Sequence, residues 1–320
     1  MKEFLYYRCV DGYVGIKTNI KNFNWPYGIC RKPVDKTEYE KCKIKVALNA
    51  VDDKNVFDCV DTENYKTSFR HFKASENKKS VIFDQTIAKF IRLRYLVTVS
   101  GNTVNAVFGK SYIKTVKIKT MYIHPVRFIL FDLVTLMLLK NGLLTVYCSA
   151  VKLSGGKTAV MLSPPNAGKS LTALNLLNKY NAKIIAEDMA VTDGEFIYGV
   201  PNTESFRNYN NEISKDISSE DMVPSGKIDY LFFMQKGSDE QLKPIDKYFE
   251  KLKMISRYAV GYYYSPFLRV LDWFNDDVSV TSAEKTEDDI IEKIQASVPG
   301  YLIERKNPME FADIIISTVQ

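Results

Sequence analysis

Short apolar runs separated by turn residues dominate the first 120 residues of the chain. Asp11-Gly12 and Ser100-Gly101-Asn102 are turn signals, so each predicts a hairpin between the runs on either side. Residues 21–43 contain prolines and a glycine and are expected to form a loop, and residues 52–79 are too polar to assign. The expected strands are residues 4–7, 13–16, 44–48, 81–83, 92–99, 103–108 and 112–123.

The pattern changes at His124-Pro125, where the chain takes up a helical period over residues 126–140 that closes at Gly142. Strands and helices then mix without strict βαβ alternation, which favours a mixed sheet. The expected strands are residues 143–153, 158–162, 182–186, 230–234 and 301–304, with a hairpin over 190–200. The expected helices are residues 171–180, 245–258, 265–274, 287–296 and 307–318. The predicted fold class is α+β, with a β-rich domain at residues 1–123 and a mixed-sheet domain at residues 124–320.

Composition, cysteine usage and apolar runs indicate the cellular compartment of the protein. The chain has 320 residues, 46% of them hydrophobic, which is enough for two domains with real cores. The cysteines are odd in number and form no CxxC pair, and with only two histidines a zinc site is disfavoured. The start of the chain has no apolar signal region, and the apolar run at 128–139 is interrupted by Asp132 and too short to span a bilayer. We therefore expect a cytoplasmic protein with reduced cysteines and no membrane partner.

The net charge of +6 is unevenly distributed along the sequence. Residues 1–120 hold 23 Lys and Arg against 12 Asp and Glu, whereas the remainder holds 21 against 26. A basic first part could bind an acidic surface or nucleic acid. The charges are scattered and not blocked, which favours solvated lysines on strand faces over a nucleic-acid partner.

The octapeptide at residues 163–170, Ser-Pro-Pro-Asn-Ala-Gly-Lys-Ser, carries the clearest chemical signal. It lies between the apolar run 158–162 and the helix-like run 171–180, which is the strand–loop–helix setting of a phosphate-binding loop. Gly168 lets the backbone approach a phosphate, Lys169 neutralises the β/γ oxygens, and the Ser170 hydroxyl can ligate Mg²⁺. The first glycine of the usual pattern is replaced by Ser163, and the alternative is a chance loop that feeds a core helix. The residues expected to bind the nucleotide are Ser163, Pro164, Pro165, Asn166, Ala167, Gly168, Lys169, Ser170 and Leu171.

A second signal follows the next predicted strand. Glu187 and Asp188 end the run 182–186, shortly after the helix that the loop begins. In such a position one carboxylate can orient Mg²⁺ and the other can accept a proton from an attacking hydroxyl. The alternative is a solvent-exposed acidic pair at a strand end.

Together these motifs resemble the HPr kinase family. The chain reads Tyr147-Cys148-Ser149-Ala150-Val151, then a Ser154-Gly155-Gly156-Lys157 turn, the loop, Ala186-Glu187-Asp188, and Gly199-Val200-Pro201 with Arg207. This order is similar to the family's over about residues 145–207. The family's histidine is replaced by Tyr147 or Cys148 and its first aspartate by Glu187, and its second signature is absent. The resemblance implies the phosphoenolpyruvate-carboxykinase-like P-loop fold and ATP-dependent phosphorylation of a hydroxyl on a peptide, protein or small molecule.

The resemblance and the residue chemistry together assign roles. Glu187 is the first choice for the catalytic base and Asp188 the second, and Lys169 balances charge on the transferred group. Ser170 with Asp188 or Glu204 would hold Mg²⁺. Arg207 would steady the γ-phosphate, or be a surface arginine. HPr kinase relatives are often oligomeric, so the resemblance allows a homo-oligomer, although no interface is evident in the sequence. The β-rich domain would recognise the acceptor.

Two other classes of protein compete with a kinase. The replaced glycine, histidine and aspartate also suit a nucleotide-binding regulator or scaffold that has lost catalysis. A GTPase of another lineage is disfavoured, because residues 178–181 fail the Asn-Lys-x-Asp pattern that reads a guanine base.

Overall fold

The computed structural model describes residues 3–20, 33–69, 71–75, 79–87, 89–116, 126–199, 205–207, 213–216, 219–259 and 280–319. The chain divides into two compact units. The first comprises residues 1–26, 30–141 and 262–284, and the second comprises residues 27–29, 142–261 and 285–320. The first unit therefore extends beyond residue 123 to include helix α3 (Val126–Lys140), which contacts the sheet of that unit at β3.

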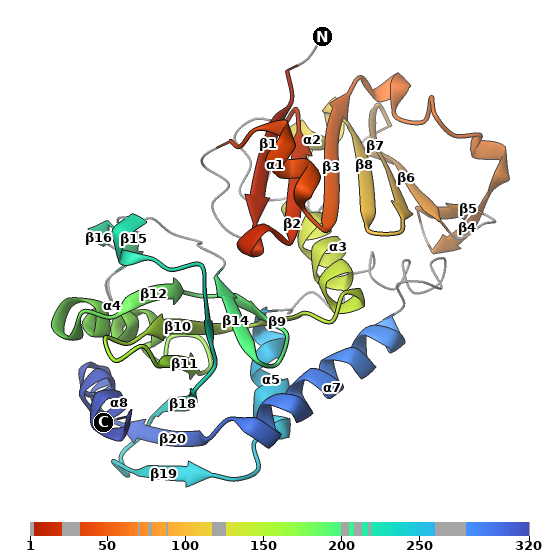
Figure 1. Cartoon of the computed structure of the whole chain (residues 1–320). Coiled ribbons are helices and arrows are strands. Elements are labelled where there is room, and N and C mark those ends of the chain that lie inside the picture. Colours follow the sequence, from red (N-terminus) through yellow and green to blue (C-terminus); the bar gives the residue numbers. More distant parts are fainter. Residues whose placement is uncertain are drawn as a thin grey trace. The chain divides into compact units, whose positions relative to one another are not determined.

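An eight-stranded mixed sheet forms the first unit (Figure 1). Its spatial order is β1-β2-β3-β8-β7-β6-β5-β4, in which β2–β3 and β3–β8 are parallel and the other pairs antiparallel. Both expected hairpins are present, and the turn between β7 and β8 is closed by the Ser100–Thr103 pair. The strands are β1 (Leu5–Cys9), β2 (Val14–Thr18), β3 (Ile44–Val51), β4 (Tyr65–Phe69), β5 (Phe72–Ser75), β6 (Ser80–Ile87), β7 (Ile91–Ser100) and β8 (Thr103–Gly109).

The strand expected at residues 112–123 is wrong where the structure describes it. Residues Lys110–Thr115 form helix α2, and residues 117–123 lie outside the described residues. Tyr112 and Thr115, three positions apart, are the buried residues of α2, which is a helical spacing. The Tyr112 ring packs on Tyr95 and Phe108, with ring centroids 5.2 and 5.6 Å away. The packing of the Tyr112 side chain against the sheet therefore favours a helix over the expected strand.

Two stretches without expected structure also contain regular elements. Helix α1 (Lys36–Lys41) lies in the predicted loop and buries Tyr39. Strands β4 and β5 lie in the unassigned polar stretch, where β5 joins the sheet through β6. Their polar composition fits positions at one edge of the sheet, and in β5 only Phe72 is buried.

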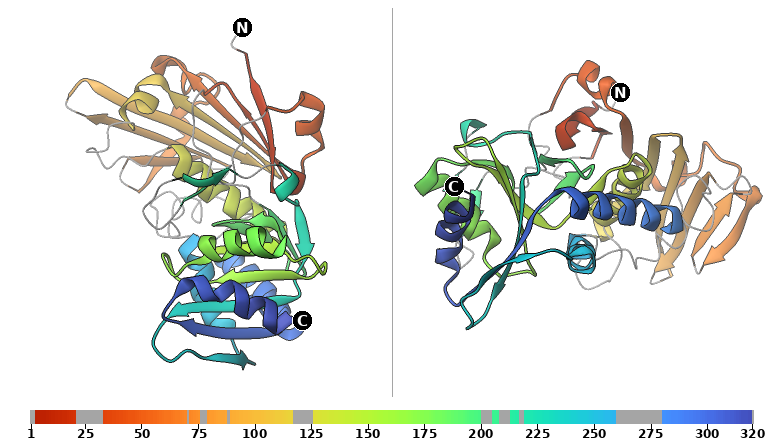
Figure 2. Two further views of the ribbon diagram at one scale, coloured as in Figure 1. Left: turned by 90° about the vertical axis from the view of Figure 1, so that its left-hand side faces the viewer. Right: turned by 60° about the horizontal axis from the view of Figure 1, so that its bottom comes forward.

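The second unit is built on a six-stranded mixed sheet, as expected (Figure 2). Its order is β12-β10-β11-β18-β20-β19, in which β11–β18 and β18–β20 are parallel and the outer pairs antiparallel. The strands are β10 (Cys148–Lys152), β11 (Thr158–Leu162), β12 (Lys183–Ala186), β18 (Tyr230–Lys236), β19 (Leu242–Ile245) and β20 (Gly300–Arg305).

Residues 143–153 form two strands instead of one. Strand β9 (Leu144–Val146) pairs with β13 in a four-stranded sheet, whereas β10 belongs to the six-stranded sheet. Tyr147 is the one residue between them, at the point where the chain passes from one sheet to the other. The remaining strands of the smaller sheet are β13 (Ala190–Thr192), β14 (Phe196–Gly199) and β17 (Ser225–Lys227), so the expected hairpin over 190–200 is confirmed through Gly199. A separate two-stranded sheet pairs β15 (Ser205–Arg207) with β16 (Ile213–Asp216).

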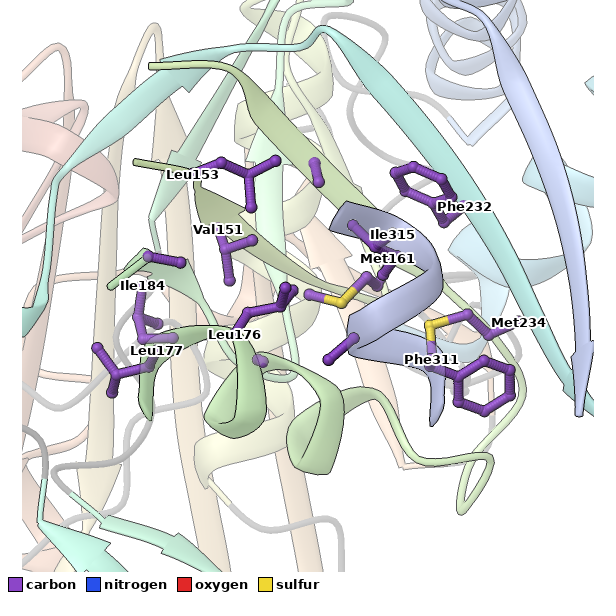
Figure 3. Close-up of a cluster of buried hydrophobic side chains, with 14 of the residues drawn as sticks. Val151, Leu153, Met161, Leu176, Leu177, Ile184, Phe232, Met234, Phe311 and Ile315 are labelled. Carbon is purple, nitrogen blue, oxygen red and sulfur yellow. The ribbon is translucent and has the colours of Figure 1, made fainter. Parts of the chain in front are cut away.

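Helices α4 (Lys169–Tyr180) and α8 (Phe311–Val319) contact each other and share a core with the six-stranded sheet. Figure 3 shows Leu176 of α4 and Ile315 of α8 beside Met161 of β11. Burying these aliphatic and aromatic side chains, at about 1.5–3 kcal/mol each, holds α4 against the sheet. This packing places the N-terminus of α4 directly after β11, where the loop lies.

The remaining expected helices differ from the structure in their bounds or lie outside the described residues. The helix expected at 245–258 starts later than predicted, because Ile245 ends β19 and α5 spans Phe249–Ala259. Helix α7 (Val280–Ser297) is longer than expected, and Asn307 caps the turn η6 (Pro308–Glu310) that leads into α8. The helix expected at 265–274 lies outside the described residues. Within the described ranges no helix is long and apolar enough to cross a membrane.

Candidate functional site: a phosphate-binding loop with two carboxylates

Three strand ends meet at one edge of the six-stranded sheet. Strand β11 ends there at Leu162, which pairs with Cys148 at the start of the antiparallel strand β10. Strand β12 ends at the same edge, because it is antiparallel to β10 and its Ala186 pairs with Ala150. The loop after Leu162 and the acidic pair after Ala186 are therefore brought together, as the sequence predicts for a nucleotide site.

The loop has the backbone of a tight turn onto a helix N-terminus. Asn166 and Gly168 adopt positive φ angles of 64° and 110°, whereas Ser163 does not adopt a positive φ. Asn tolerates the left-handed region better than most residues, and glycine does so without strain. The loop therefore needs a glycine at 168 but not at 163, which explains how serine is accommodated in place of the usual first glycine.

Close packing around Gly168 also leaves no room for a side chain at this position. A Cβ atom at this position would lie 2.9 Å from Cβ of Pro308 and 3.8 Å from the Phe311 ring. On the other side, the Gly168 carbonyl accepts hydrogen bonds from the amide and the hydroxyl of Thr172, at 2.9 and 3.0 Å. The first turn of α4 carries no acidic side chain, so its free amides and helix dipole favour an anion there.

Lys169 is almost fully buried, with 4% of its surface exposed. Its ammonium group donates to the carbonyl and to the hydroxyl of Ser163, both at 3.2 Å, and lies 3.8 Å above the Tyr147 ring centroid. Burial lowers the pKa of Lys169 to about 8, and the charges of Asp188 and Glu187 oppose that shift. A buried cation whose contacts are neutral oxygens and an aromatic face is suited to receive an anionic phosphate.

Tyr147 links the lysine to the acidic pair. The Asp188 carboxylate lies near its hydroxyl, close enough for its charge and hydrogen bonding to raise the pKa of the tyrosine. Burial is the main reason why the pKa of Tyr147 is raised, and the charges of Asp188 and Glu187 raise it further. Burial likewise raises the pKa of the neighbouring Cys148 thiol to about 12, so this cysteine stays neutral. The tyrosine is therefore a neutral hydrogen-bond donor at the centre of the site.

Ser149 fixes the backbone of the acidic pair. Its hydroxyl, which is fully buried, donates to the carbonyl oxygen of Glu187. The chain turns after β12 at this point, with Glu187 partly buried and Asp188 exposed. The hydrogen bond ties residue 187 to β10 and leaves the Asp188 side chain at the surface beside Tyr147.

The residues present fit Mg²⁺ bound together with phosphates. The described residues hold no cluster of three or more His, Cys, Asp or Glu that could cage a metal by itself. Mg²⁺ in phosphoryl-transfer sites needs only one or two protein oxygens besides the phosphate oxygens. The Ser170 hydroxyl, on the first turn of α4, and the Asp188 carboxylate are oxygen donors of that kind.

Two expected site residues have no described side chain. Glu204, an alternative metal ligand, lies outside the described residues, and Arg207 is described only by its backbone in β15. Their roles stay predictions. The sequence reasoning missed Tyr147 and Ser149 as site residues. The signal that could have found them was the position of their run directly before the strand that leads into the loop.

Comparison with known proteins adds little to the site. No family model and no curated protein matches the chain. A solved structure of the HPr(Ser) kinase/phosphatase from Coxiella burnetii is similar over 32% of this chain and 70% of its own, with 13% identity and a TM-score of 0.26. A TM-score this low does not establish a common fold, so the function rests on the residues of the site.

Proposed function

We propose that this chain is an ATP- and Mg²⁺-dependent kinase that transfers the γ-phosphoryl group to a hydroxyl of a peptide, protein or small molecule. The observation that carries the proposal is the buried Lys169, which lies at the start of α4 within the electrostatic reach of Glu187 and Asp188. A phosphate-binding cation and two carboxylates at one sheet edge are the parts that phosphoryl transfer requires.

Each of these residues has a separate task in the proposed reaction. The amides of residues 166–169 and the Lys169 ammonium would bind and neutralise phosphate oxygens. Glu187 would accept the proton of the acceptor hydroxyl as the new O–P bond forms and the bond from the γ-phosphorus to the β–γ bridging oxygen breaks, releasing ADP. Mg²⁺, when bound, supplies further charge neutralisation at the phosphates, and Ser170 and Asp188 would hold it.

Calorimetry with ATP and Mg²⁺ tests the binding half. Lys169→Ala should weaken ATP binding by about 10- to 100-fold, because a charged contact is worth about 1.5–3 kcal/mol. Lys157→Ala is the matched control. This lysine lies at the turn before β11, is more than half exposed and pairs with Asp229 at 3.0 Å, so its loss should leave ATP affinity unchanged. If the wild-type chain binds no ATP at millimolar concentration, nucleotide binding is refuted.

Radiolabelled ATP with candidate hydroxyl acceptors tests the transfer half. Glu187→Gln should bind ATP nearly as well as the wild type and transfer no phosphate, because an amide cannot accept the proton. The alternative function is a nucleotide-binding regulator without catalysis, which the exposed Asp188 and the Glu at position 187 also permit. ATP binding by the wild type without hydrolysis or transfer to any acceptor would favour that alternative.

A further inference from the structure

We propose that Tyr147 is a positioning residue whose ring holds the Lys169 ammonium and whose hydroxyl orients the Asp188 carboxylate. The inference rests on the proposed nucleotide site and adds a residue that joins its two halves. It is carried by the 3.8 Å approach of Lys169 Nζ to the ring centroid and by the strand pairings that fix the backbone on both sides of Tyr147, and the Asp188 carboxylate lies near the hydroxyl of the same side chain.

The backbone on both sides of Tyr147 is fixed, which a positioning residue requires. Val146 pairs with Ala190 in the four-stranded sheet, and Cys148 pairs with Leu162 in the six-stranded sheet. The tyrosine therefore occupies a single-residue link between two hydrogen-bonded strands and cannot move far without breaking one of the pairings. A side chain on so rigid a base can hold its neighbours in a defined geometry.

The ring acts on the lysine. Lys169 has lost almost all contact with water, and its ammonium donates hydrogen bonds to two Ser163 oxygens at 3.2 Å. The aromatic face supplies a third attraction for the cation without adding a carboxylate that would repel phosphate. These contacts hold the ammonium at the loop, where it could exchange a Ser163 oxygen for a phosphate oxygen.

The hydroxyl acts on the carboxylate. Asp188 is exposed on a turn, where an aspartate would otherwise rotate freely in water. A hydrogen bond from the half-buried Tyr147, which lies between β9 and β10, would select one orientation of that carboxylate. The orientation matters for the role proposed above, because a Mg²⁺ ligand must present its oxygen at a fixed place.

Two substitutions separate these tasks. Tyr147→Phe retains the ring and removes the hydroxyl, whereas Tyr147→Leu removes both. ATP affinity is measured by calorimetry, first in EDTA and then with saturating Mg²⁺, and the turnover number is measured with radiolabelled ATP. Tyr147→Phe should bind ATP in EDTA as the wild type does, but the gain in affinity from Mg²⁺ and the turnover number should each fall about tenfold. Tyr147→Leu should in addition lose about three- to tenfold in EDTA.

Tyr198→Phe is the matched control. Tyr198 is a half-buried tyrosine of the same unit that donates a 2.8 Å hydrogen bond to Asp193, in the turn between β13 and β14. Its loss should change none of the three quantities, and circular dichroism shows whether each variant is folded. The inference is overturned if Tyr147→Phe keeps the Mg²⁺ gain, or if Tyr147→Leu binds ATP in EDTA as tightly as Tyr147→Phe does.

The possible failures can be told apart. If the wild type binds ATP but transfers no phosphate, the kinase proposal fails while the two affinity measurements still decide the role of Tyr147. If the wild type binds no ATP, the proposed function fails and this inference fails with it. Equal losses in Tyr147→Phe and Tyr198→Phe would mean that the tyrosine stabilises the fold and does not position the site.

Discussion

Gly168→Ala is the substitution whose effect follows most directly from the geometry of the loop. Alanine at a φ of 110° is strained, and its Cβ would lie 2.9 Å from Cβ of Pro308. The backbone strain costs about 1–2 kcal/mol. Overpacking against the ring of a proline adds about 1–3 kcal/mol, because neither partner has a flexible end that can move away. The expected loss of stability is therefore about 2–5 kcal/mol.

Gly156→Ala separates the two contributions. Gly156 also has a positive φ, 83°, and a Cβ at that position would have no atom within 4 Å. The control should therefore lose only the backbone part, about 1–2 kcal/mol. Because the chain has two units, stability is best followed for the second unit alone, by urea-dependent hydrogen exchange of peptides from β11 and α4.

The prediction also has a functional part. A shift of Pro308 or of the loop should displace the backbone amides after residue 166, so Gly168→Ala should weaken ATP binding while Gly156→Ala leaves it unchanged. Equal losses of stability in the two variants would refute the reasoning, since the contact with Pro308 would then have no energetic weight. Normal ATP binding by Gly168→Ala would refute the assignment of the loop as the phosphate site.

Two further predictions concern a surface carboxylate and the hydroxyl below the acidic pair. Asp84 in β6 is partly buried, which raises its pKa, but Arg92 and Arg94 outweigh burial and hold it below its ordinary value of 3.8. Its stabilisation is thus complete above that value and is lost as the pH falls through the lower folded pKa. Asp84→Asn should cost about 1 kcal/mol at pH 7, as measured by urea unfolding. The difference from the wild type should shrink as the pH falls below 3.8 and vanish below the lowered folded pKa, and a difference that persists there would contradict this. Ser149→Ala should free the Glu187 carbonyl and lower phosphoryl transfer without weakening ATP binding, as radiolabelled ATP and calorimetry can show; unchanged transfer would contradict the role of that hydrogen bond.

Local sequence patterns predicted those elements whose turn residues and hydrophobic period lie within the element itself. The hairpin of β7 and β8 follows from alternation on both sides of a Gly101-Asn102 turn, and helix α3 from an apolar period that ends at Gly142. Helix α2 could not be predicted this way. Its identity depends on Tyr112 packing among aromatic residues from β7 and β8, and a short sequence window contains no sign of those partners.

The site was predictable in its parts and not in its connections. The loop and the acidic pair are each a short continuous segment that can be recognised in the sequence. Both segments lie at one edge of the six-stranded sheet. The role of Tyr147 depends on where β9 ends and β10 begins, and the sequence pattern of 143–153 predicts one continuous strand there. The register between β10 and β12 shifts between Ala150 and Val151, so alternation alone could not align the acidic pair with Ser149.

The replacement of the first loop glycine by Ser163 takes on a different meaning in the structure. A positive φ favours glycine, or asparagine as the next best residue, and in this loop it occurs at Asn166 and Gly168 and not at Ser163. Position 163 instead supplies two oxygens to Lys169, its carbonyl and its hydroxyl, and glycine could supply only the first. Ser163→Gly should therefore retain the loop conformation and remove one acceptor from a buried ammonium. The departure from the usual motif is compatible with phosphate binding, and the question of lost catalysis rests on Glu187 and on the residue that replaces the family's histidine.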